Sequence, residues 1–171
     1  MIEMRPWLER VFPFDLPLSM FPNVLERLRG TPARLEDRVR DVPPERLVWR
    51  PGEAWSVQET LGHLLLVEDL WSGRLDDLLA GAKELRPAGY DPRLVEEARF
   101  NERPLADLLA AFRAARLRSV GRLEDLGSSD VERTAFHPRL KRTVDVLDVM
   151  VFAAEHDDHH LARVTQILVR N

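Results

Sequence analysis

The chain contains no cysteine among its 171 residues, and this absence excludes several kinds of chemistry at once. Disulfide bonds, thiolate metal sites and a cysteine nucleophile cannot occur in a chain of this composition. A metal ion bound by side chains would therefore need histidine and carboxylate ligands.

The sequence also lacks a strong charge of one sign and long apolar runs. Its 25 Lys and Arg residues against 29 Asp and Glu residues give a net charge of -4, which argues against a nucleic-acid partner. The apolar runs are far shorter than a membrane span, and residues 1–6 lack the basic-then-apolar pattern of a signal peptide. We therefore expect one domain over residues 1–171, located in the cytoplasm, without a membrane partner.

No stretch shows the alternating pattern of a β-strand, and neither an internal repeat nor a low-complexity segment is present. Apolar residues recur instead at helical spacing, and proline and glycine divide the pattern. The helices that this predicts are residues 20–41 (one kinked helix or two short ones), 56–80, a short one from Asp91-Pro92 to Phe100, 104–126 and 143–170. We predict an all-α four-helix bundle with a short packed N-terminal arm and one longer crossover region, 81–103.

The clearest helix start is Ser56-Val57-Gln58-Glu59, which fits a capping box. In the helix that follows, His63 lies on the same stripe as Val67 and Leu70, so its imidazole is expected to face the bundle interior. A single histidine on such a stripe is more often hydrogen-bonded in the core than a metal ligand.

Three of the five histidines lie close together in the last predicted helix, at His156, His159 and His160. His156 and His160 are four residues apart, so on a helix they lie on one face, in the inward stripe that continues to Val164. His159 belongs to the neighbouring, more polar face. Two imidazoles one turn apart can reach the same metal ion.

Burying two such imidazoles without a partner is unfavourable, because each unpaired polar group costs about 1–3 kcal/mol. A metal ion bound to His156 and His160 would satisfy both, and His63 on another helix would supply a third nitrogen. Three protein ligands with an open position are typical of a catalytic metal site. The residues considered for a supporting role beside these ligands are Asp157, His159 and Glu68. The alternatives are a solvated helix charge for Asp157, a surface position for His159 and a salt bridge for Glu68.

Two other histidine arrangements are less favourable. The spacing of His156 to His160 is similar to the H-E-x-x-H motif of zinc proteases, but Asp stands in place of the Glu base, and no His, Asp or Glu follows His160. The third ligand should therefore come from upstream.

His137 precedes Pro138 in a predicted loop and is expected to have a structural or surface role. Trp55 and Trp71 are expected to pack in the bundle or to line the mouth of a pocket.

The chain resembles the DinB-like, or DinB/YfiT-type, proteins over nearly its whole length. The motifs that carry the resemblance are Trp49-Arg50-Pro51, Trp55-Ser56-Val57-Gln58-Glu59, Leu61-Gly62-His63-Leu64, Glu68, Phe100-Asn101-Glu102, residues 108–116, His137-Pro138, Thr143-Val144 and His156-Asp157-Asp158-His159-His160. Each motif is weak alone, and the ordered set is specific. The resemblance implies a four-helix bundle that binds one divalent metal through His63, His156 and His160. Imidazole ligands suit zinc or nickel, so we expect one of these two ions.

The resemblance also implies a small-molecule substrate and a homodimer, and it leaves the reaction open. One outcome is a metal-dependent hydrolase that acts through a metal-activated water. Another is a thiol-dependent S-transferase or isomerase that binds a low-molecular-weight thiol, of the bacillithiol or mycothiol type, as a metal thiolate. The third is a binding protein in which the metal only stabilises the bundle. No general base is assigned by the motifs.

Overall fold

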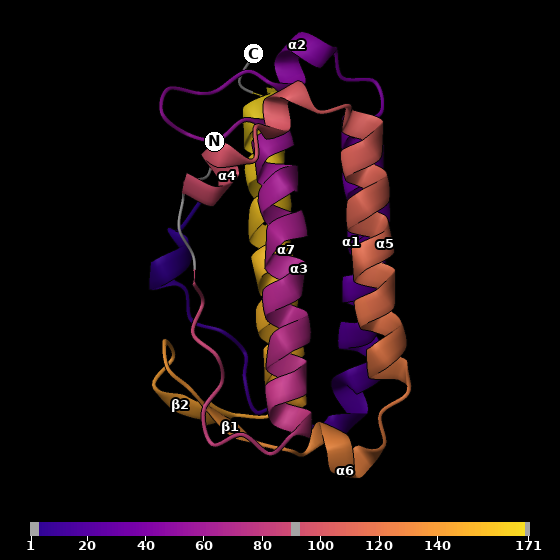
Figure 1. Cartoon of the computed structure of the whole chain (residues 1–171), viewed down its shortest axis with the longest axis vertical. Coiled ribbons are helices and arrows are strands. Elements are labelled where there is room, and N and C mark those ends of the chain that lie inside the picture. The colour runs from indigo at the N-terminus through magenta and orange to yellow at the C-terminus, as the bar shows by residue number, and fades with distance from the viewer. Residues whose placement is uncertain (1–3, 90–92, 170–171) are drawn as a thin grey trace.

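The computed structural model describes residues 4–89 and 93–169. Its long helices are α1 (Phe21–Val39), α3 (Val57–Leu79), α5 (Leu105–Glu124) and α7 (Val146–Val169). Short helices α2 (Pro44–Leu47), α4 (Arg93–Glu97) and α6 (Ser128–Val131) lie in the connections, and single 3-10 turns lie at Trp7–Glu9, Leu18–Met20 and Phe100–Glu102. The long helices lie side by side (Figure 1), which confirms the predicted all-α four-helix bundle. None of the helices in the described ranges has the length and hydropathy needed to cross a membrane.

The bundle has two parallel pairs of helices. In Figure 1, α1 and α7 run in one direction, and α3 and α5 run in the other. Helix α1 packs against α5 and α7, and α3 packs against the same two helices, so the connections from α1 to α3 and from α5 to α7 cross a diagonal of the bundle. The segment between α3 and α5 returns along the length of the bundle, as the predicted crossover region requires.

The ends of the helices follow from local sequence signals. The Ser56 hydroxyl accepts a hydrogen bond from the Glu59 backbone N–H at 3.1 Å, and the Ser56 N–H donates to the Glu59 carboxylate at 2.9 Å, so the predicted capping box is present. Gly81, with φ at 71°, follows the last turn of α3. Helix α1 contains Pro32 in its interior and is one helix, which decides between the two alternatives left by the sequence.

Two apolar clusters fill the bundle, and a polar layer separates them. One cluster includes Leu28, Leu75 and Met150, and the other includes Leu35 and Leu161. Between them the four helices contribute buried polar side chains, which are Thr31, His63, Glu68, Arg116, His156, Asp157 and His160. The long helices therefore place their chemistry-bearing residues at one height in the bundle.

The N-terminal arm packs on α7. The Trp7 ring lies 5.2 Å from the Phe152 ring, measured between centroids, and the Phe12 ring lies 4.9 Å from it. This agrees with the arm expected from the sequence. It also covers a face of α7 that the sequence pattern assigned to a more polar environment.

Two details of the sequence prediction need correction or fall outside the described residues. The prediction that the chain has no strand is wrong, because β1 (Ala135–His137) and β2 (Arg142–Val144) form an antiparallel hairpin. Strands of three residues are too short to show an alternating pattern. Asp91-Pro92, predicted to begin a helix, lies outside the described residues, and α4 is described from Arg93.

The packing of α3 predicts opposite effects for two glycine substitutions inside helices. A Cβ at Gly62 would lie 2.2–2.5 Å from atoms of the buried Phe100 ring, whereas a Cβ at Gly30 would have no heavy atom within 4 Å. We expect Gly62→Ala to lower the free energy of unfolding by about 1–3 kcal/mol through overpacking. Gly30→Ala should raise it by up to about 1 kcal/mol, since alanine is the better helix former. Urea denaturation measures both, and equal effects of the two substitutions would contradict this packing.

Candidate metal centre

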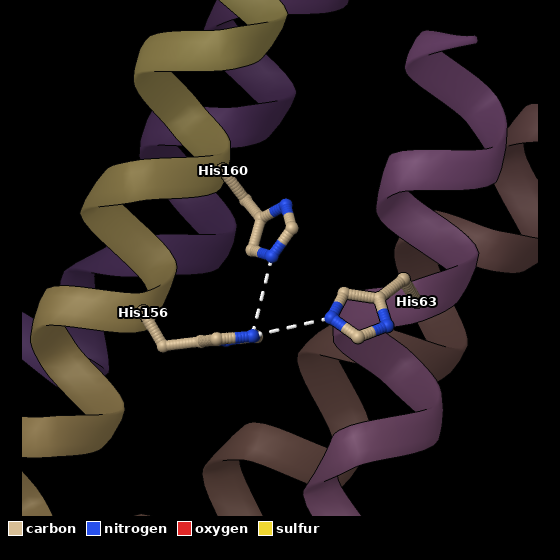
Figure 2. A group of neighbouring side chains, drawn as sticks. All are labelled: His63, His156 and His160. Carbon is tan, nitrogen blue, oxygen red and sulfur yellow. Dashed lines mark hydrogen bonds between the residues drawn. The ribbon is translucent and has the colours of Figure 1, made fainter. Parts of the chain in front are cut away.

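Three imidazoles converge inside the bundle at the height of the polar layer. His63 projects from α3, and His156 and His160 project from α7, with their rings directed toward one another (Figure 2). The Nε2 atom of His156 lies 3.1 Å from Nε2 of His63 and 3.2 Å from Nε2 of His160. The three side chains each offer one nitrogen, and these nitrogens all lie within 4.8 Å of one another. The structure thus brings together the three ligands expected from the sequence.

These nitrogens have the spacing that a small divalent ion requires. A tetrahedral ion with metal–nitrogen distances of 2.0–2.1 Å places its ligand atoms about 3.3–3.4 Å apart. The Nε2–Nε2 distances from His156 to His63 and to His160, 3.1 Å and 3.2 Å, are within a few tenths of an ångström of that value.

Burial keeps these imidazoles in the protonation state that metal binding needs. Desolvation lowers the pKa of His63 to about 4. Desolvation, reinforced by the repulsion of the neighbouring imidazoles, holds the pKa of His156 and of His160 well below the usual value. A neutral imidazole has a free lone pair for a metal, so the donor set fits a divalent ion at neutral pH.

The three imidazoles line a cavity of about 340 Å³, so a ligand or a water molecule can reach their shared centre. The cavity wall is largely aromatic. Trp71 of α3 and Trp55 in the segment before α3 line the cavity and also pack with the apolar clusters, so both roles expected from the sequence are present. Trp7 closes the cavity from the N-terminal arm. The Trp7 ring lies 5.2 Å from the His156 ring, measured between centroids.

Sequence reasoning missed three of the residues that line this cavity: Trp7, Arg74 and Arg139. Arg74 continues the helical spacing of His63, Val67 and Leu70, so its inward position can be read from the sequence. A long charged side chain at an inward position is itself informative, because arginine is almost never fully buried unless it is paired. The arm and the hairpin turn that carry Trp7 and Arg139 give no such periodic signal.

Glu68 and Asp157 lie beside the ligand positions in sequence but contact Arg116 rather than an imidazole. Arg116 donates to Glu68 at 2.6 Å and 2.9 Å, and it donates to both carboxylate oxygens of Asp157. Among the described residues, Nδ1 of His156 and of His160 has no hydrogen-bond partner. The direct imidazole–carboxylate bond considered from the sequence is therefore absent from the described part of the chain.

The remaining two histidines have different surroundings. His159 is 9% exposed, and its ring packs against those of Trp7 and His160 at centroid distances of 5.5 Å and 5.4 Å. It therefore lines the cavity, although its nitrogen is not among the three that converge. His137 is 1% exposed in β1, packs against Phe152, and accepts a hydrogen bond from the Leu140 N–H. Of the two roles expected for His137, the structural one fits and the surface one does not.

Comparison with known proteins gives a family match and a fold match. The sequence profile of the DinB superfamily matches residues 27–164. A protein of Bacillus pumilus (strain SAFR-032), named "Putative metal-dependent hydrolase", is 26% identical over 157 residues, which are 90% of this chain and 84% of the relative.

Two solved structures are similar to this one in fold. The first is YfiT from Bacillus subtilis, described as "a probable metal-dependent hydrolase with an unusual four-helix bundle topology". It has a TM-score of 0.77 and 22% identity, over 98% of this chain and 93% of YfiT. The second is a mycothiol-dependent maleylpyruvate isomerase, with a TM-score of 0.67 and 12% identity, over 91% of this chain and 68% of the isomerase.

The depressed pKa values of the buried imidazoles predict how stability depends on pH. Because the pKa of His63 in the folded chain, about 4, lies below its value near 6.5 in the unfolded chain, the unfolded chain binds more protons between these pH values. Stability is therefore fully present above pH 6.5 and is lost as the pH falls toward 4. We expect a loss of up to about 1.4 kcal/mol per pH unit for each such histidine.

Urea denaturation in the presence of a chelator, at pH values from 7.5 to 5, measures this dependence. His156→Gln removes one of the imidazoles with a depressed pKa and should reduce the slope by about one proton. A free energy of unfolding that stays constant from pH 6.5 to 5 would contradict the burial of neutral imidazoles.

Proposed function

The chain belongs to the DinB superfamily, and on that basis we propose that it is a metal-dependent enzyme whose ion is held by His63, His156 and His160. The observation that carries this proposal is the convergence of three buried nitrogens on one point at the wall of a cavity. When bound, a divalent ion supplies Lewis acidity that lowers the pKa of a coordinated water or thiol. Imidazole ligands suit zinc or nickel.

Hydrolysis is the reaction we favour first. The Bacillus pumilus relative is named for metal-dependent hydrolysis, and it covers most of this chain. The residues of this chain would hold the ion, exclude bulk water through the indole rings of Trp7, Trp55 and Trp71, and keep the ligand imidazoles neutral. The cavity supports an open site over a purely structural one, in which protein ligands close all positions.

Thiol-dependent group transfer is the second candidate, because the fold is shared with a mycothiol-dependent isomerase. In this case the cavity would hold a low-molecular-weight thiol together with an electrophilic small molecule. A cavity of about 340 Å³ has the size of a small-molecule site.

The homodimer and the cytoplasmic location expected from the sequence stay predictions.

The metal site predicts different effects for two adjacent histidine substitutions. Protein purified without a nickel column should contain about one divalent ion per chain. His160→Ala removes one of the three converging nitrogens and should abolish metal retention, whereas His159→Ala leaves all three in place and should retain the metal. Elemental analysis after dialysis measures the metal content.

Two results would contradict this assignment. One is a folded wild-type protein that contains no metal and binds none when zinc or nickel is added. The other is loss of the metal in the His159→Ala protein with retention in the His160→Ala protein, which would require a different set of ligands.

The thiol reaction predicts a change in the spectrum of the cobalt-substituted protein. A thiolate bound to cobalt gives an intense charge-transfer band, so millimolar cysteamine or a bacillithiol-like thiol should alter the visible and near-ultraviolet absorption. A spectrum that does not change at millimolar thiol counts against group transfer and leaves hydrolysis as the proposed reaction. The His160→Ala protein serves as the control, since it should show no cobalt spectrum of this kind.

A further inference from the structure

The cavity beside the three imidazoles contains a buried arginine that lacks a carboxylate partner. Arg74 of α3 is 1% exposed, and its Nη2 atom has no hydrogen-bond partner among the described residues. Its Nε atom makes only a long hydrogen bond, 3.4 Å, to the backbone carbonyl of Arg86. Asp77, whose charge also acts on Arg74, is already paired with Arg86.

Arg116 provides a contrast within the same bundle. It is 2% exposed, as deeply buried as Arg74, and it forms ion pairs with both Glu68 and Asp157. A buried charge is normally paired in this way because desolvation of an unpaired one is unfavourable by several kcal/mol. Arg74 departs from that rule, and it does so at the wall of a cavity.

A second guanidinium faces the same cavity. Arg139, in the turn between β1 and β2, is exposed and forms no ion pair among the described residues. Desolvation, together with repulsion from the positive charge of Arg139, lowers the pKa of Arg74 to about 10. Two like charges thus line one cavity without a counter-charge from the described residues.

Each guanidinium group lies near a tryptophan ring that in turn lies near the His156 ring. The Arg74 guanidinium carbon lies 5.4 Å from the Trp71 ring, and that ring lies 5.7 Å from the His156 ring. The Arg139 guanidinium carbon lies 6.0 Å from the Trp7 ring, which lies 5.2 Å from His156. A small molecule can therefore span the space between the imidazoles and the arginines.

We propose that Arg74 and Arg139 form an oxyanion-binding end of this cavity, which receives a carboxylate or phosphate ester group of a substrate whose other end faces the three imidazoles. This inference names the substrate class of the proposed enzyme and so rests on the proposed function. Guanidinium groups bind carboxylates and phosphates through paired, charge-assisted hydrogen bonds. Arg74 lines the cavity and has an unused donor at Nη2, and the exposed Arg139 supplies a second charge that attracts the anion.

Calorimetric titration of the metal-loaded protein tests the proposal. The probes are succinate and methyl phosphate, which separate the carboxylate from the phosphate ester, and the neutral control is succinamide. We expect one of the two anions to bind at least about tenfold more tightly than succinamide. Arg74→Gln and Arg139→Gln should each weaken that anion by about tenfold or more, because each removes a charge-assisted bond.

Arg118→Gln is the matched control, since Arg118 is an exposed arginine of α5 that does not line the cavity. It should leave anion binding within about twofold of wild type. The proposal is overturned if neither anion binds better than succinamide, or if Arg74→Gln and Arg139→Gln bind the anion as wild type does. If Arg74→Gln fails to fold, the exposed position of Arg139 keeps the second variant informative.

Thermal melting separates a ligand-binding arginine from a structural one. Removing the unpaired charge of Arg74 should leave the Tm of Arg74→Gln at or above that of wild type. Arg116→Gln, which breaks two buried ion pairs, should lower the Tm by about 10 °C. A comparable fall for Arg74→Gln would assign Arg74 a structural role, and the anion site would then be upheld or overturned by the Arg139→Gln titration.

Metal analysis of the same samples separates this inference from the proposed function. If the purified protein contains no metal but still binds the anion through Arg74 and Arg139, the anion site is supported and the proposed metal-dependent reaction is contradicted. A protein that retains one ion per chain, but binds the anions independently of Arg74 and Arg139, would leave the metal centre and overturn the anion site.

Discussion

The ion pairs of Arg116 are the interaction on which the arrangement of this bundle depends. From α5, Arg116 binds Glu68 of α3, Asp157 of α7 and the backbone carbonyl of Leu28 in α1, and the Thr31 hydroxyl of α1 donates to Asp157. All four long helices therefore meet at one guanidinium. Leaving either carboxylate or the arginine unpaired in this interior would be strongly unfavourable, so the cluster fixes the relative height and rotation of the helices.

The Arg116 ion pairs also constrain the positions of two of the imidazoles. Asp157 follows His156 on α7, and Glu68 lies five residues after His63 on α3, so holding the two carboxylates also sets where the two imidazoles project. The polar layer is thus divided into an ionic cluster and an imidazole cluster. The first is fully paired, whereas the second lines the cavity. This is the division expected when one part of a layer supports and the other part binds.

Much of this could be predicted from spacing alone. The four-residue step from His156 to His160, and the stripe that joins His63 to Val67, placed three imidazoles toward the interior, and the structure confirms that they meet. The environment of His159 was not predictable in the same way, because the N-terminal arm covers its face of α7 through Trp7. The pairing of Asp157 with Arg116 was not predicted, and for Glu68 a salt bridge was one of two alternatives, without an assigned partner. Helical phase says which way a side chain points but not what meets it from another helix.

The sequence by itself determined the long helices, their inward faces and the three histidines that face one another, because helical periodicity and the Ser56 capping box are local properties of the chain. Only the tertiary structure decided which helices are neighbours, since both the α1–α3 and the α5–α7 connections cross the bundle. It also decided that Arg74 and Arg139 line one cavity. Contacts between residues far apart in the chain are set by packing and by the pairing of buried charges, and no local pattern encodes them.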